Sequence, residues 1–455
     1  MRSSLSWSDL AGLRVGVWGL GVEGTASVAR LASMGIEPVL ADDTPPAGEV
    51  SGLPVLATAA GGLAALRGCD VVIKAPGISR YRADARSVEA AGVPLVGGLG
   101  LWMAQAPRDR VACVTGTKGK SSTVSIAGHL LSSLGYKCLV GGNIGRPPYD
   151  VQYLGVDFDY WLIETSSYQA TDLPFSPPVV AVTSLHPDHL PWHEGVENYY
   201  RDKLSACTQP GCDLTVANGD SDILRELRHL LGPRVEWVRA DDDPRASWME
   251  PLGLLGSHSR RNALIARACL RALGVPEAAS EDALAGAAAG FGGLESRLQN
   301  LGTVGGVTFV DDSLSTNVLP TLAALDAFPG RPVALIVGGQ DRGIDYGPLA
   351  AGLMTRPAPT LVLTLPESGR RILAAVKAAA AGVEAAAARV EIRECAQLAV
   401  AVQQAYRWSR GRDGGLVLLS PAAPSFGQFR NYRHRSEAFL AAARALGELR
   451  PPAAG

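Results

Sequence analysis

The sequence predicts an α/β protein of three domains, each built around a largely parallel sheet. Its 455 residues are about three times the roughly 150 residues of a typical domain. Short apolar runs of strand character alternate with stretches of helical composition along the chain. Two of these runs lead directly into glycine-rich turns that are followed by helical segments, an order typical of parallel α/β domains.

The first domain is expected at residues 1–106, with a Rossmann-like fold. Its predicted strands are Leu13–Trp18, Glu37–Ala41 and Asp70–Lys74. The first strand runs into Gly19–Gly24, whose glycines have the spacing GxGxxG, and Thr25–Ala32 has helical composition. Alternating strands and helices imply a parallel sheet whose ligand site lies at the carboxyl ends of its strands. The polar stretch Gln105–Arg110 is the expected linker to the next domain.

The central domain, expected at residues 107–301, opens with a strand, Val111–Thr115, and a second glycine-rich turn before a helical run, Thr123–Leu134. Glycine allows backbone N–H groups to converge on phosphate oxygens, and the amino end of the helix adds partial positive charge. Lys120 can reach the β and γ oxygens and Ser121 can bind magnesium, which predicts a nucleoside triphosphate site. The residues expected to contact the nucleotide here are Gly116, Thr117, Lys118, Gly119, Lys120, Ser121 and Ser122.

Both glycine-rich turns have alternative interpretations. The second turn has the spacing GxxGK[ST], shorter than the common GxxxxGK[ST], so a turn without a ligand stays an alternative. The first is compatible with a dehydrogenase that holds a dinucleotide ribose on Asp42, with a nucleotide-sugar pocket, or with tight packing of a helix on a strand. The triphosphate site favours the nucleotide-sugar pocket over the dehydrogenase, because hydride transfer needs no triphosphate.

Two further strand ends of the central domain carry candidate metal ligands. Glu164 follows the strand Tyr160–Ile163 and can face the nucleotide phosphates as a magnesium ligand. The strand Val179–Thr183 leads to a segment that holds His186, His189 and His193. Magnesium prefers oxygen ligands and takes a histidine only as a minor partner.

A zinc site is the weaker alternative, because zinc would require three or four nitrogen or sulfur ligands. The seven cysteines form no CxxC pair, which also argues against a disulfide framework. His186 and His193 are interpreted as hydrogen-bonding groups. Lys203, taken alone, has the pattern of a solvated helix lysine.

The third domain is expected at residues 302–455 and is again Rossmann-like. Its predicted strands are Val307–Asp312, Val333–Val337, Thr360–Leu363 and Leu416–Leu419. An alanine-rich helix is predicted over Ile372–Ala388, because alanine has the highest helix propensity.

Composition narrows the classes of partner. Lysine and arginine number 42 and aspartate and glutamate 44, so a net charge of −2 gives no positive field for nucleic acid or an anionic membrane. No apolar run approaches the roughly 18–20 residues that span a bilayer. The first 12 residues lack the pattern of a secretory signal. We therefore expect a cytoplasmic protein without a nucleic-acid or membrane partner.

In their order along the whole chain, these motifs closely resemble the Mur ligases of peptidoglycan precursor synthesis, and among them those that add glutamate to UDP-N-acetylmuramoyl-L-alanine. The residues that carry the resemblance are Gly19–Gly24, TGTKGKSS at Thr115–Ser122, Gly141–Gly145, ETSSYQ at Glu164–Gln169, Asp188-His189, Lys203, Asn262, Arg297, Asp311–Ser313, and Leu419-Ser420-Pro421 through Gln428-Phe429. The resemblance implies a UDP-binding domain, an ATPase domain, and a third domain that closes over the amino-acid substrate.

The resemblance also implies catalytic roles in ATP-dependent, ADP-forming amide synthesis through an acyl phosphate. Lys120 and Ser121 would bind phosphate and one of two Mg²⁺ ions, and Glu164 would share that ion. His189 and Lys203 would hold the second ion, with Lys203 carbamylated so that it carries a carboxylate-like anion.

Further contacts follow from the same resemblance. Asn262, Arg297 and Asp312 would contact the adenosine and ribose of ATP. In the first domain the expected uridine diphosphate pocket is formed by Gly21, Val22, Glu23, Asp42 and Gly77, with Asn143 near the sugar and pyrophosphate. The family resemblance suggests a monomer.

The expected amino-acid pocket departs from the family pattern. Glutamate ligases of the family usually have DSKATN at the position of Asp312–Asn317. This segment, which includes Thr316, has leucine in place of the lysine. Arg342 replaces an expected lysine, and its planar fork suits a bidentate carboxylate. Ser425-Phe426 and Tyr432 replace serine-leucine and phenylalanine.

These departures, with the spellings TGTKGKS and DHLPWH, resemble a branch that attaches L-glutamate and leaves inversion to a separate epimerase. We therefore favour L-glutamate over D-glutamate as the substrate. A folylpolyglutamate-synthase-like ligase is disfavoured, because it should lack the domain that here precedes Gly116. A regulatory nucleotide-binding module is disfavoured because Lys120, Glu164, His189 and Lys203 are all present.

Overall fold

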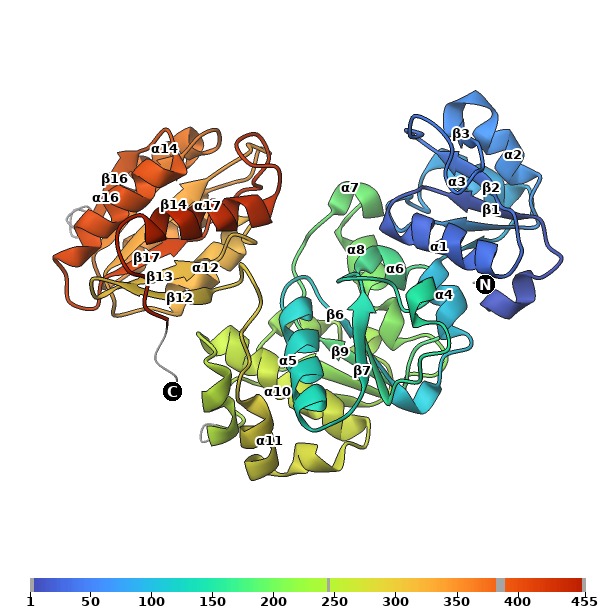
Figure 1. Ribbon diagram of the computed structural model, residues 1–455, viewed down its shortest axis with the longest axis horizontal. Helices are drawn as coiled ribbons and strands as arrows, with labels where there is room; N and C mark the ends of the chain where they lie inside the picture. The colour runs from blue at the N-terminus through green and yellow to red at the C-terminus, as the bar shows by residue number, and fades with distance from the viewer. Residues whose placement is uncertain (1–3, 244–245, 382–388, 452–455) are drawn as a thin grey trace. The chain divides into compact units, whose positions relative to one another are not determined.

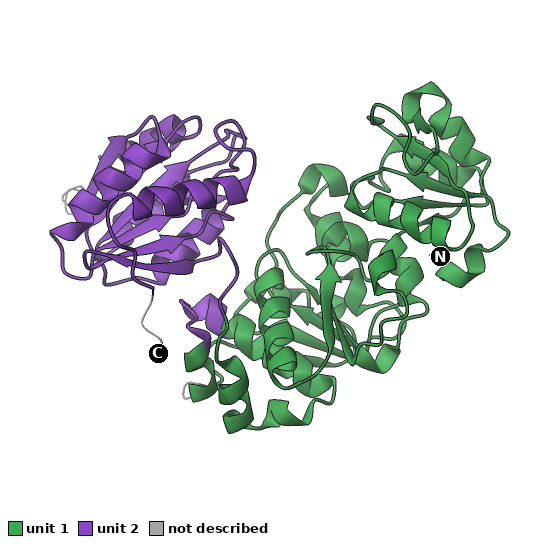
Figure 2. Ribbon diagram, in the orientation of Figure 1, with its two compact units in different colours: residues 1–251, 261–291 green, residues 252–260, 292–455 purple. Residues whose placement is uncertain are grey.

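The computed structural model describes residues 4–243, 246–381 and 389–451, and these form three sheets (Figure 1). The chain divides into two compact units (Figure 2). Unit 1 is formed by Met1–Pro251 and Arg261–Phe291 and contains the first two sheets, whereas unit 2 is formed by Leu252–Arg260 and Gly292–Gly455 and contains the third. The α/β class with mostly parallel sheets is confirmed.

The first sheet has five parallel strands in the order β3-β2-β1-β4-β5. The strands are β1 (Val15–Trp18), β2 (Val39–Asp42), β3 (Val55–Ala57), β4 (Val71–Lys74) and β5 (Leu95–Val96). The helices are α1 (Val22–Ser33), α2 (Leu63–Arg67), α3 (Ala83–Ala90) and α4 (Gly98–Met103). From β1 the chain adds β2 and β3 on one side of the sheet and then β4 and β5 on the other. The order of the strands therefore reverses between β1 and β4, and open α/β sheets bind ligands at such a switch point.

The third glycine of the GxGxxG turn brings α1 close to β1. A Cβ atom at Gly24 would lie 1.8 Å from the carbonyl oxygen of Gly19. Helix α1 begins at Val22, three residues ahead of the predicted Thr25, so Gly24 lies in its first turn. Tight packing of helix on strand is thus one role of this turn, and it does not exclude a ligand at its first two glycines.

The second sheet has six parallel strands in the order β11-β10-β9-β6-β8-β7. The strands are β6 (Val111–Thr115), β7 (Cys138–Gly142), β8 (Tyr160–Glu164), β9 (Val179–Val182), β10 (Leu214–Asn218) and β11 (Val235–Val238). The helices are α5 (Lys120–Ser133), α6 (Ser167–Ala170), α7 (Leu190–His193), α8 (Val196–Leu204), α9 (Asp222–Glu226), α10 (Ser257–Ala272) and α11 (Glu281–Ala288).

The third sheet has the order β12-β13-β17-β14-β15-β16, and only the β12–β13 pair is antiparallel. Its strands are β12 (Gln299–Val304), β13 (Val307–Asp311), β14 (Val333–Gly338), β15 (Thr360–Leu365), β16 (Val390–Glu394) and β17 (Leu416–Leu419). Helices α12 (Val318–Asp326), α13 (Gly347–Thr355) and α14 (Gly369–Ala380) pack on one face. Helices α16 (Leu398–Arg410) and α17 (Tyr432–Arg444) pack on the other.

Every predicted strand is confirmed, with ends that move by one or two residues. The predicted helix Ile372–Ala388 corresponds to α14, and its residues 382–388 lie outside the described residues. The limits proposed for the three domains stay predictions; β12 begins at Gln299, before the expected start at residue 302.

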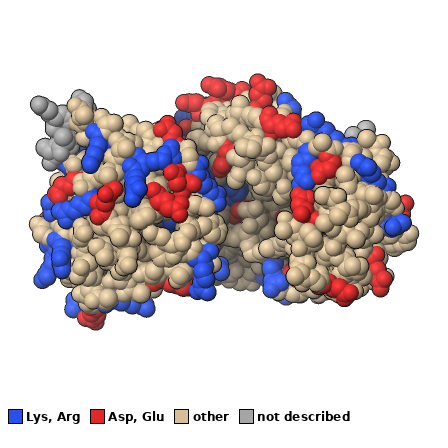
Figure 3. Space-filling model, turned by 90° about the horizontal axis from the view of Figure 1, so that it is seen from above, with Lys and Arg blue, Asp and Glu red and all other residues tan. Residues whose placement is uncertain are grey.

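All seven cysteines are free thiols. Acidic and basic side chains are interspersed on the face in Figure 3, and within the described ranges every helix is too short or too polar to cross a bilayer.

A buried ion cluster joins the first sheet to the second within unit 1. Lys74, the last residue of β4, lies 2.5 Å from an oxygen of Asp172, and both side chains are almost fully buried. Arg80 contacts the other Asp172 oxygen at 2.5 Å. Burial alone would raise the pKa of Asp172, but the charges of Lys74 and Arg80 bring this pKa below its ordinary value. The carboxylate therefore stays ionised between two cations.

A second contact between the two sheets involves Glu23, in the first turn of α1. Its carboxyl group accepts hydrogen bonds from Gln169 Nε2 at 2.6 Å and from the Tyr149 hydroxyl at 3.2 Å. Burial raises the pKa of Glu23 from 4.5 to about 7, and these two hydrogen bonds offset only part of the effect.

We expect Asp172→Asn to destabilise unit 1 by about 3–5 kcal/mol, because it leaves the buried Lys74 ammonium without its carboxylate. Urea unfolding followed by tryptophan fluorescence measures the change. Asp157→Asn is the matched control, since the side chain of Asp157 is 97% exposed and pairs with Arg110 at 3.8 Å; it should change stability by less than about 0.5 kcal/mol. Equal effects of the two substitutions would contradict this account.

The raised pKa of Glu23 makes stability depend on pH. Between pH 4.5 and about 7 the folded state holds a proton that the unfolded state has lost, so the free energy of unfolding falls as pH rises. From about pH 5 to about pH 8, the wild type should lose about 2–3 kcal/mol relative to Glu23→Gln. Urea titrations at several pH values measure this difference. Glu37→Gln, at an exposed glutamate, should have the same dependence of stability on pH as the wild type. If the stability of Glu23→Gln also changed with pH as that of the wild type does, the raised pKa would not belong to Glu23.

Candidate active site

The candidate site lies where neighbouring strands of the second sheet end. The register places Val114 of β6 and Gly142 of β7 beside Glu164 at the end of β8. The phosphate loop follows β6, Asn143 follows β7, and the histidine segment follows β9. The carboxyl ends of parallel strands meet at one edge, so four segments far apart in sequence converge there.

The glycines of the phosphate loop have no room for a side chain. Gly116 has a φ of +136°, and a Cβ atom there would lie 2.2 Å from Thr183 Oγ1. Gly119 has a φ of +91°, and its Cβ would lie 2.8 Å from Asn262 Oδ1. Helix α5 begins directly after Gly119, so its amino end lies in the loop. Asn262, predicted to contact the nucleotide, therefore packs against this loop.

Two backbone N–H groups of the loop are bonded to the protein. The Thr117 N–H donates to the Ser184 carbonyl and the Lys118 N–H to Ser184 Oγ, both at 2.8 Å. The Thr117 hydroxyl lies 3.0 Å from the His186 carbonyl and 2.8 Å from the Tyr199 hydroxyl. These bonds fix the loop and leave the amino end of α5 as its main source of positive backbone charge.

Two lysine ammonium groups meet at the carbonyl oxygen of Gly116. Lys120 Nζ donates to this oxygen at 2.9 Å and Lys203 Nζ at 3.1 Å. Lys203 is only 3% exposed, so it is no solvated helix lysine. Burial, and then the positive charge of Lys120, lower the pKa of Lys203 well below its ordinary value. Lys120 thus supplies positive charge suited to phosphate at this edge of the sheet.

Glu164 is 2% exposed, and one of its oxygens has no protein partner. Oε1 accepts from Asn143 Nδ2 at 2.6 Å, whereas Oε2 is buried without a hydrogen-bond partner among the described residues. A buried carboxylate oxygen normally binds a donor or a metal, because its desolvation is costly. The residues present therefore fit a magnesium ion at this point. Asn143 itself bonds Glu164, and its predicted contact with the sugar stays a prediction.

The segment after β9 brings His189 to the same edge. His189 has a φ of +52°, and its ring lies 5.2 Å from the ring of Tyr168. Partial burial lowers the pKa of His189, which favours the neutral ring that a metal ligand requires. The side chain of Asp188 lies 3.5 Å from Lys118 Nζ.

The other two histidines of the segment differ in their roles. His193 is fully buried and bonds Asp202 and Ser167 through its two ring nitrogens, so its interpretation as a hydrogen-bonding group is confirmed. His186 contacts the phosphate loop through its backbone N–H and carbonyl. Across residues 4–243, 246–381 and 389–451, no three His, Cys, Asp or Glu side chains lie close enough together to hold a metal ion. A magnesium site here would take its other ligands from Ser121, a modified Lys203, phosphate and water.

The residues predicted to bind a uridine diphosphate lie at the carboxyl edge of the first sheet. Asp42 accepts from the Leu20 N–H at 2.6 Å and from the Thr44 N–H at 2.8 Å, so its carboxylate fixes the glycine-rich turn. Gly21 and Val22 are exposed beside it, and Val22 is 70% exposed. The Glu23 carboxyl group bonds Gln169 and Tyr149, which leaves its backbone as the group available to a ligand.

Gly77 is exposed and connects this edge to the histidine segment. Its carbonyl accepts from Trp192 Nε1 at 3.0 Å, and Ser79 Oγ donates to the Trp192 carbonyl at 2.6 Å. The Trp192 ring stacks on Tyr168 with centroids 4.4 Å apart. Sequence reasoning did not identify this contact, because nothing local in the DHLPWH segment indicates a partner more than 100 residues earlier.

In unit 2, the predicted site residues follow three adjacent strands at one edge of the third sheet. Asp312 and Thr316 follow β13, Arg342 follows β14, and Ser425, Phe426 and Tyr432 follow β17. Thr316, Arg342 and Phe426 are exposed, whereas Ser425 is buried. Arg342 Nε donates to Gln340 Oε1 at 3.2 Å. Arg297 precedes β12 and is half-buried.

Asp312 is a buried structural carboxyl group in unit 2. It accepts from the Leu298 N–H at 3.2 Å and from Ser420 Oγ at 2.7 Å, and Ser315 Oγ is a further partner. Burial raises its pKa to about 6, against these hydrogen bonds. Its predicted contact with the nucleotide stays a prediction.

Sequence reasoning also missed Arg435, which is 1% exposed. Its guanidinium donates to the Ala423 carbonyl at 3.1 Å and to the Ser313 carbonyl at 2.7 Å. Arg435 thereby ties together two loops that carry predicted substrate residues. An arginine one turn into a helix has the pattern of a solvated side chain, so no local signal could have identified it.

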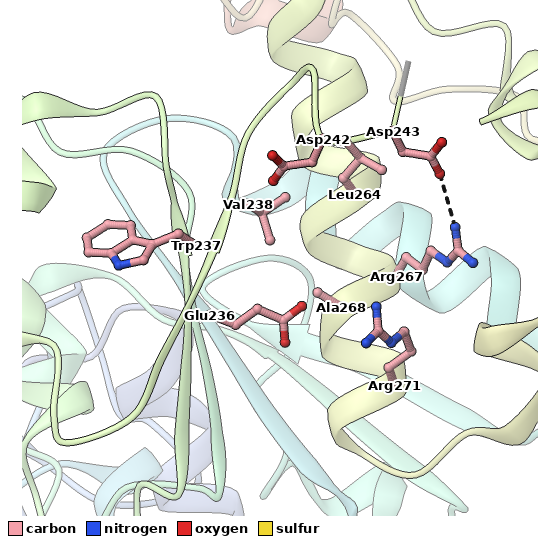
Figure 4. A pocket seen from close by; sticks show the side chains of 9 residues that line it. All are labelled: Glu236, Trp237, Val238, Asp242, Asp243, Leu264, Arg267, Ala268 and Arg271. Atoms are coloured by element: carbon pink, nitrogen blue, oxygen red, sulfur yellow. Dashed lines mark hydrogen bonds and ion pairs between the residues drawn. The ribbon is translucent and has the colours of Figure 1, made fainter. Parts of the chain in front are cut away.

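A separate pocket of about 260 Å³ opens between β11 and α10 (Figure 4). Its charged lining is formed by Glu236, Asp242, Asp243, Arg267 and Arg271, and Arg267 pairs with Asp243 at 3.4 Å. None of the predicted site residues lines it.

Comparisons with known proteins identify the family of this chain. Residues 114–251 match the model of the Mur ligase middle domain. The chain is 40% identical to UDP-N-acetylmuramoyl-L-alanine--L-glutamate ligase of a Micromonospora species, over 96% of this chain and 98% of the relative. It is 39% identical to the protein of the same name from Salinispora tropica, with the same shares covered.

Solved structures share the fold at low identity. UDP-N-acetylmuramate-alanine ligase MurC from Thermotoga maritima has a TM-score of 0.55 and 17% identity, covering 96% of this chain and 100% of its own. MurF from Acinetobacter baumannii has a TM-score of 0.57 and 16% identity, covering 95% and 90%. With full-length relatives near 40% identity, the chain belongs to the Mur ligase family of ATP-dependent, ADP-forming ligases in peptidoglycan precursor synthesis.

Proposed function

We propose that the chain joins L-glutamate to the alanyl carboxylate of UDP-N-acetylmuramoyl-L-alanine, with ATP converted to ADP and phosphate. Full-length relatives that carry the name of this reaction support the substrates. The observation that carries the chemistry is the meeting of Lys120 and Lys203 on one carbonyl, on the same edge of the sheet as a buried Glu164 oxygen without a partner.

Charge is the main obstacle in the first step. An alanyl carboxylate oxygen attacks the γ-phosphorus of ATP, ADP leaves, and an acyl phosphate forms. Both reactants are anions, so the repulsion between them has to be offset. Lys120 and the amino end of α5 supply positive charge that stays fixed during the reaction. Two Mg²⁺ ions, when bound, would neutralise phosphate charge and orient the reacting oxygens.

The chain can hold these ions with residues from four segments. Ser121 and Glu164 would bind one ion, and His189 and Lys203 the other. Lys203 can act as a ligand only after a change in its charge. Burial and the charge of Lys120 lower the pKa of this amine, and an amine that has lost its proton can add CO₂ and release a second proton to become a carbamate. The carbamate would turn the positive charge of the Lys203 ammonium into a negative charge beside Lys120, and its oxygen atoms could then bind Mg²⁺.

In the second step the amine of glutamate attacks the acyl carbonyl. The amine loses a proton, the tetrahedral intermediate collapses, and phosphate leaves as the amide forms. The positive charge of Lys120 stabilises the oxyanion that develops. Arg342 and the hydroxyls of Thr316 and Ser425 are the proposed partners of glutamate, and Phe426 and Tyr432 would shape the pocket. A fork-shaped arginine in place of an ammonium supports the L enantiomer, because it shifts where a carboxylate is held.

Steady-state amide formation with each enantiomer tests the substrate. We expect L-glutamate to have at least a 10-fold higher kcat/KM than D-glutamate, which corresponds to about 1.4 kcal/mol. In the same assay, ¹⁸O placed in the alanyl carboxylate should appear in the released phosphate. A preference for D-glutamate would overturn the enantiomer, and unlabelled phosphate would overturn the acyl phosphate.

The metal role of Lys203 predicts a rescue experiment. Lys203→Ala should lower kcat by at least about 100-fold, because a ligand is lost. Short carboxylic acids added to the variant should restore part of the rate by replacing the carbamate. Lys137→Ala, at an exposed lysine, is the matched control and should keep wild-type kcat with no response to the acids. If the rate of Lys203→Ala equalled that of the wild type, Lys203 would have no role at the metal.

A further inference from the structure

A buried histidine–aspartate pair lies behind the predicted metal ligands. His193 Nδ1 lies 2.6 Å from Asp202 Oδ2, and His193 Nε2 lies 3.0 Å from Ser167 Oγ. The Tyr81 hydroxyl donates to both Asp202 oxygens, at 3.2 and 3.0 Å. We call these four residues the hub. His193 is fully buried and Asp202 and Ser167 nearly so.

Each member of the hub belongs to a segment that carries one predicted site residue. Asp202 immediately precedes Lys203 in α8. His193 ends α7, four residues after His189. Ser167 begins α6, three residues after Glu164, and Tyr81 lies four residues after Gly77. The hub therefore joins three of the four proposed metal-binding segments to the loop expected to hold uridine diphosphate.

The bonds of the hub are directional. A neutral imidazole with its proton on Nδ1 donates to the Asp202 carboxylate and accepts from the Ser167 hydroxyl, so both ring nitrogens are satisfied. Asp202 accepts from two donors on different elements, which fixes the rotation of α8 at the position of Lys203. A purely apolar contact would fix separation between the elements but not this rotation.

Ring contacts support the same arrangement from the other side. Tyr168, next to Ser167, has its ring centroid 4.4 Å from Trp192, next to His193. The His193 ring lies 5.2 Å from Tyr199, whose hydroxyl is 2.8 Å from the Thr117 hydroxyl of the phosphate loop. The hub thus contacts the phosphate loop only through Tyr199, whereas its own members lie in the other three segments that carry a proposed metal ligand.

We propose that His193 and Asp202 are positioning residues that set the separation of Glu164, His189 and Lys203, and that Tyr81 couples this arrangement to the loop at Gly77. The inference rests on the proposed function, because it concerns the metal site of that reaction. Groups behind metal ligands commonly control affinity by holding the ligands in place, with 10–100-fold losses when they are removed. Asp202 and His193 occupy this position toward Lys203 and His189.

The test uses the full-length protein and Mn²⁺ as the probe. Electron paramagnetic resonance measures Mn²⁺ affinity with a non-hydrolysable ATP analogue present. His193→Asn should weaken Mn²⁺ binding by at least about 10-fold and lower kcat, with the KM for the UDP-sugar substrate changed less than about 3-fold. Ser167→Ala should act in the same direction. Tyr81→Phe should instead raise the KM for the UDP-sugar substrate by about 3–10-fold while Mn²⁺ affinity stays close to wild type.

Controls separate positioning from folding. His129→Asn is the matched control, because His129 also bonds a neighbour, the Ala289 carbonyl at 3.1 Å, but lies away from the predicted ligands. It should keep wild-type Mn²⁺ affinity and kcat. Ser167→Ala and Tyr81→Phe each remove one hydroxyl and keep the His193–Asp202 pair, so they test the inference even if His193→Asn does not fold.

The outcomes are distinguishable. If folded His193→Asn and Ser167→Ala bind Mn²⁺ and turn over as the wild type does, the hub has no positioning role. If Tyr81→Phe leaves the KM for the UDP-sugar substrate unchanged, the coupling to Gly77 is wrong. If the wild type itself releases no phosphate with UDP-N-acetylmuramoyl-L-alanine, glutamate and ATP, the proposed function fails, and the inference with it.

Discussion

The candidate active site is organised around an electrostatic imbalance at the carboxyl edge of the second sheet. Lys120 and Lys203 both direct their amines at the Gly116 carbonyl, and Lys203 is buried. Like charges in a poorly solvated place are unfavourable unless anions are brought to them. Nucleotide phosphates and a carbamate on Lys203 would each remove part of this imbalance. The glycines at 116 and 119 are necessary because only a backbone without side chains allows such close approach.

The rest of unit 1 serves to hold this edge in one arrangement. The Lys74–Asp172–Arg80 cluster and the Glu23–Gln169 contact join the first sheet to α6, which follows Glu164. The hub at His193 and Asp202 continues the connection to α8 and Lys203. Buried ionic and hydrogen-bonded groups are poor sources of net stability, but they specify one relative position of the elements that they join. This specificity is what the proposed two-metal reaction would require of its scaffold.

Several carboxylates that sequence motifs assigned to ligands have protein partners in this structure, and their contacts with ligands stay predictions. Asp42 accepts from two backbone N–H groups, Glu23 bonds Gln169 and Tyr149, and Asp312 bonds Leu298, Ser315 and Ser420. These bonds shape the loops around a ligand, so a motif residue can be essential to a site without touching what is bound. Glu164 differs from them, because one of its oxygens has no protein donor among the described residues.

The sequence alone predicted ten of the 17 strands that the structure describes, the two glycine-rich turns and the order of the motifs. These depend on local sterics and on hydrophobic periodicity, which a short window of residues contains. Only the tertiary structure decided which partner each buried polar group has. Lys74 and Asp172 are 98 residues apart and Tyr149 and Glu23 are 126 residues apart, and no local pattern encodes such pairs. Burial also depends on the tertiary structure. By its sequence pattern Lys203 is a solvated helix lysine, but its amine is desolvated because α8 packs this side chain against the phosphate loop.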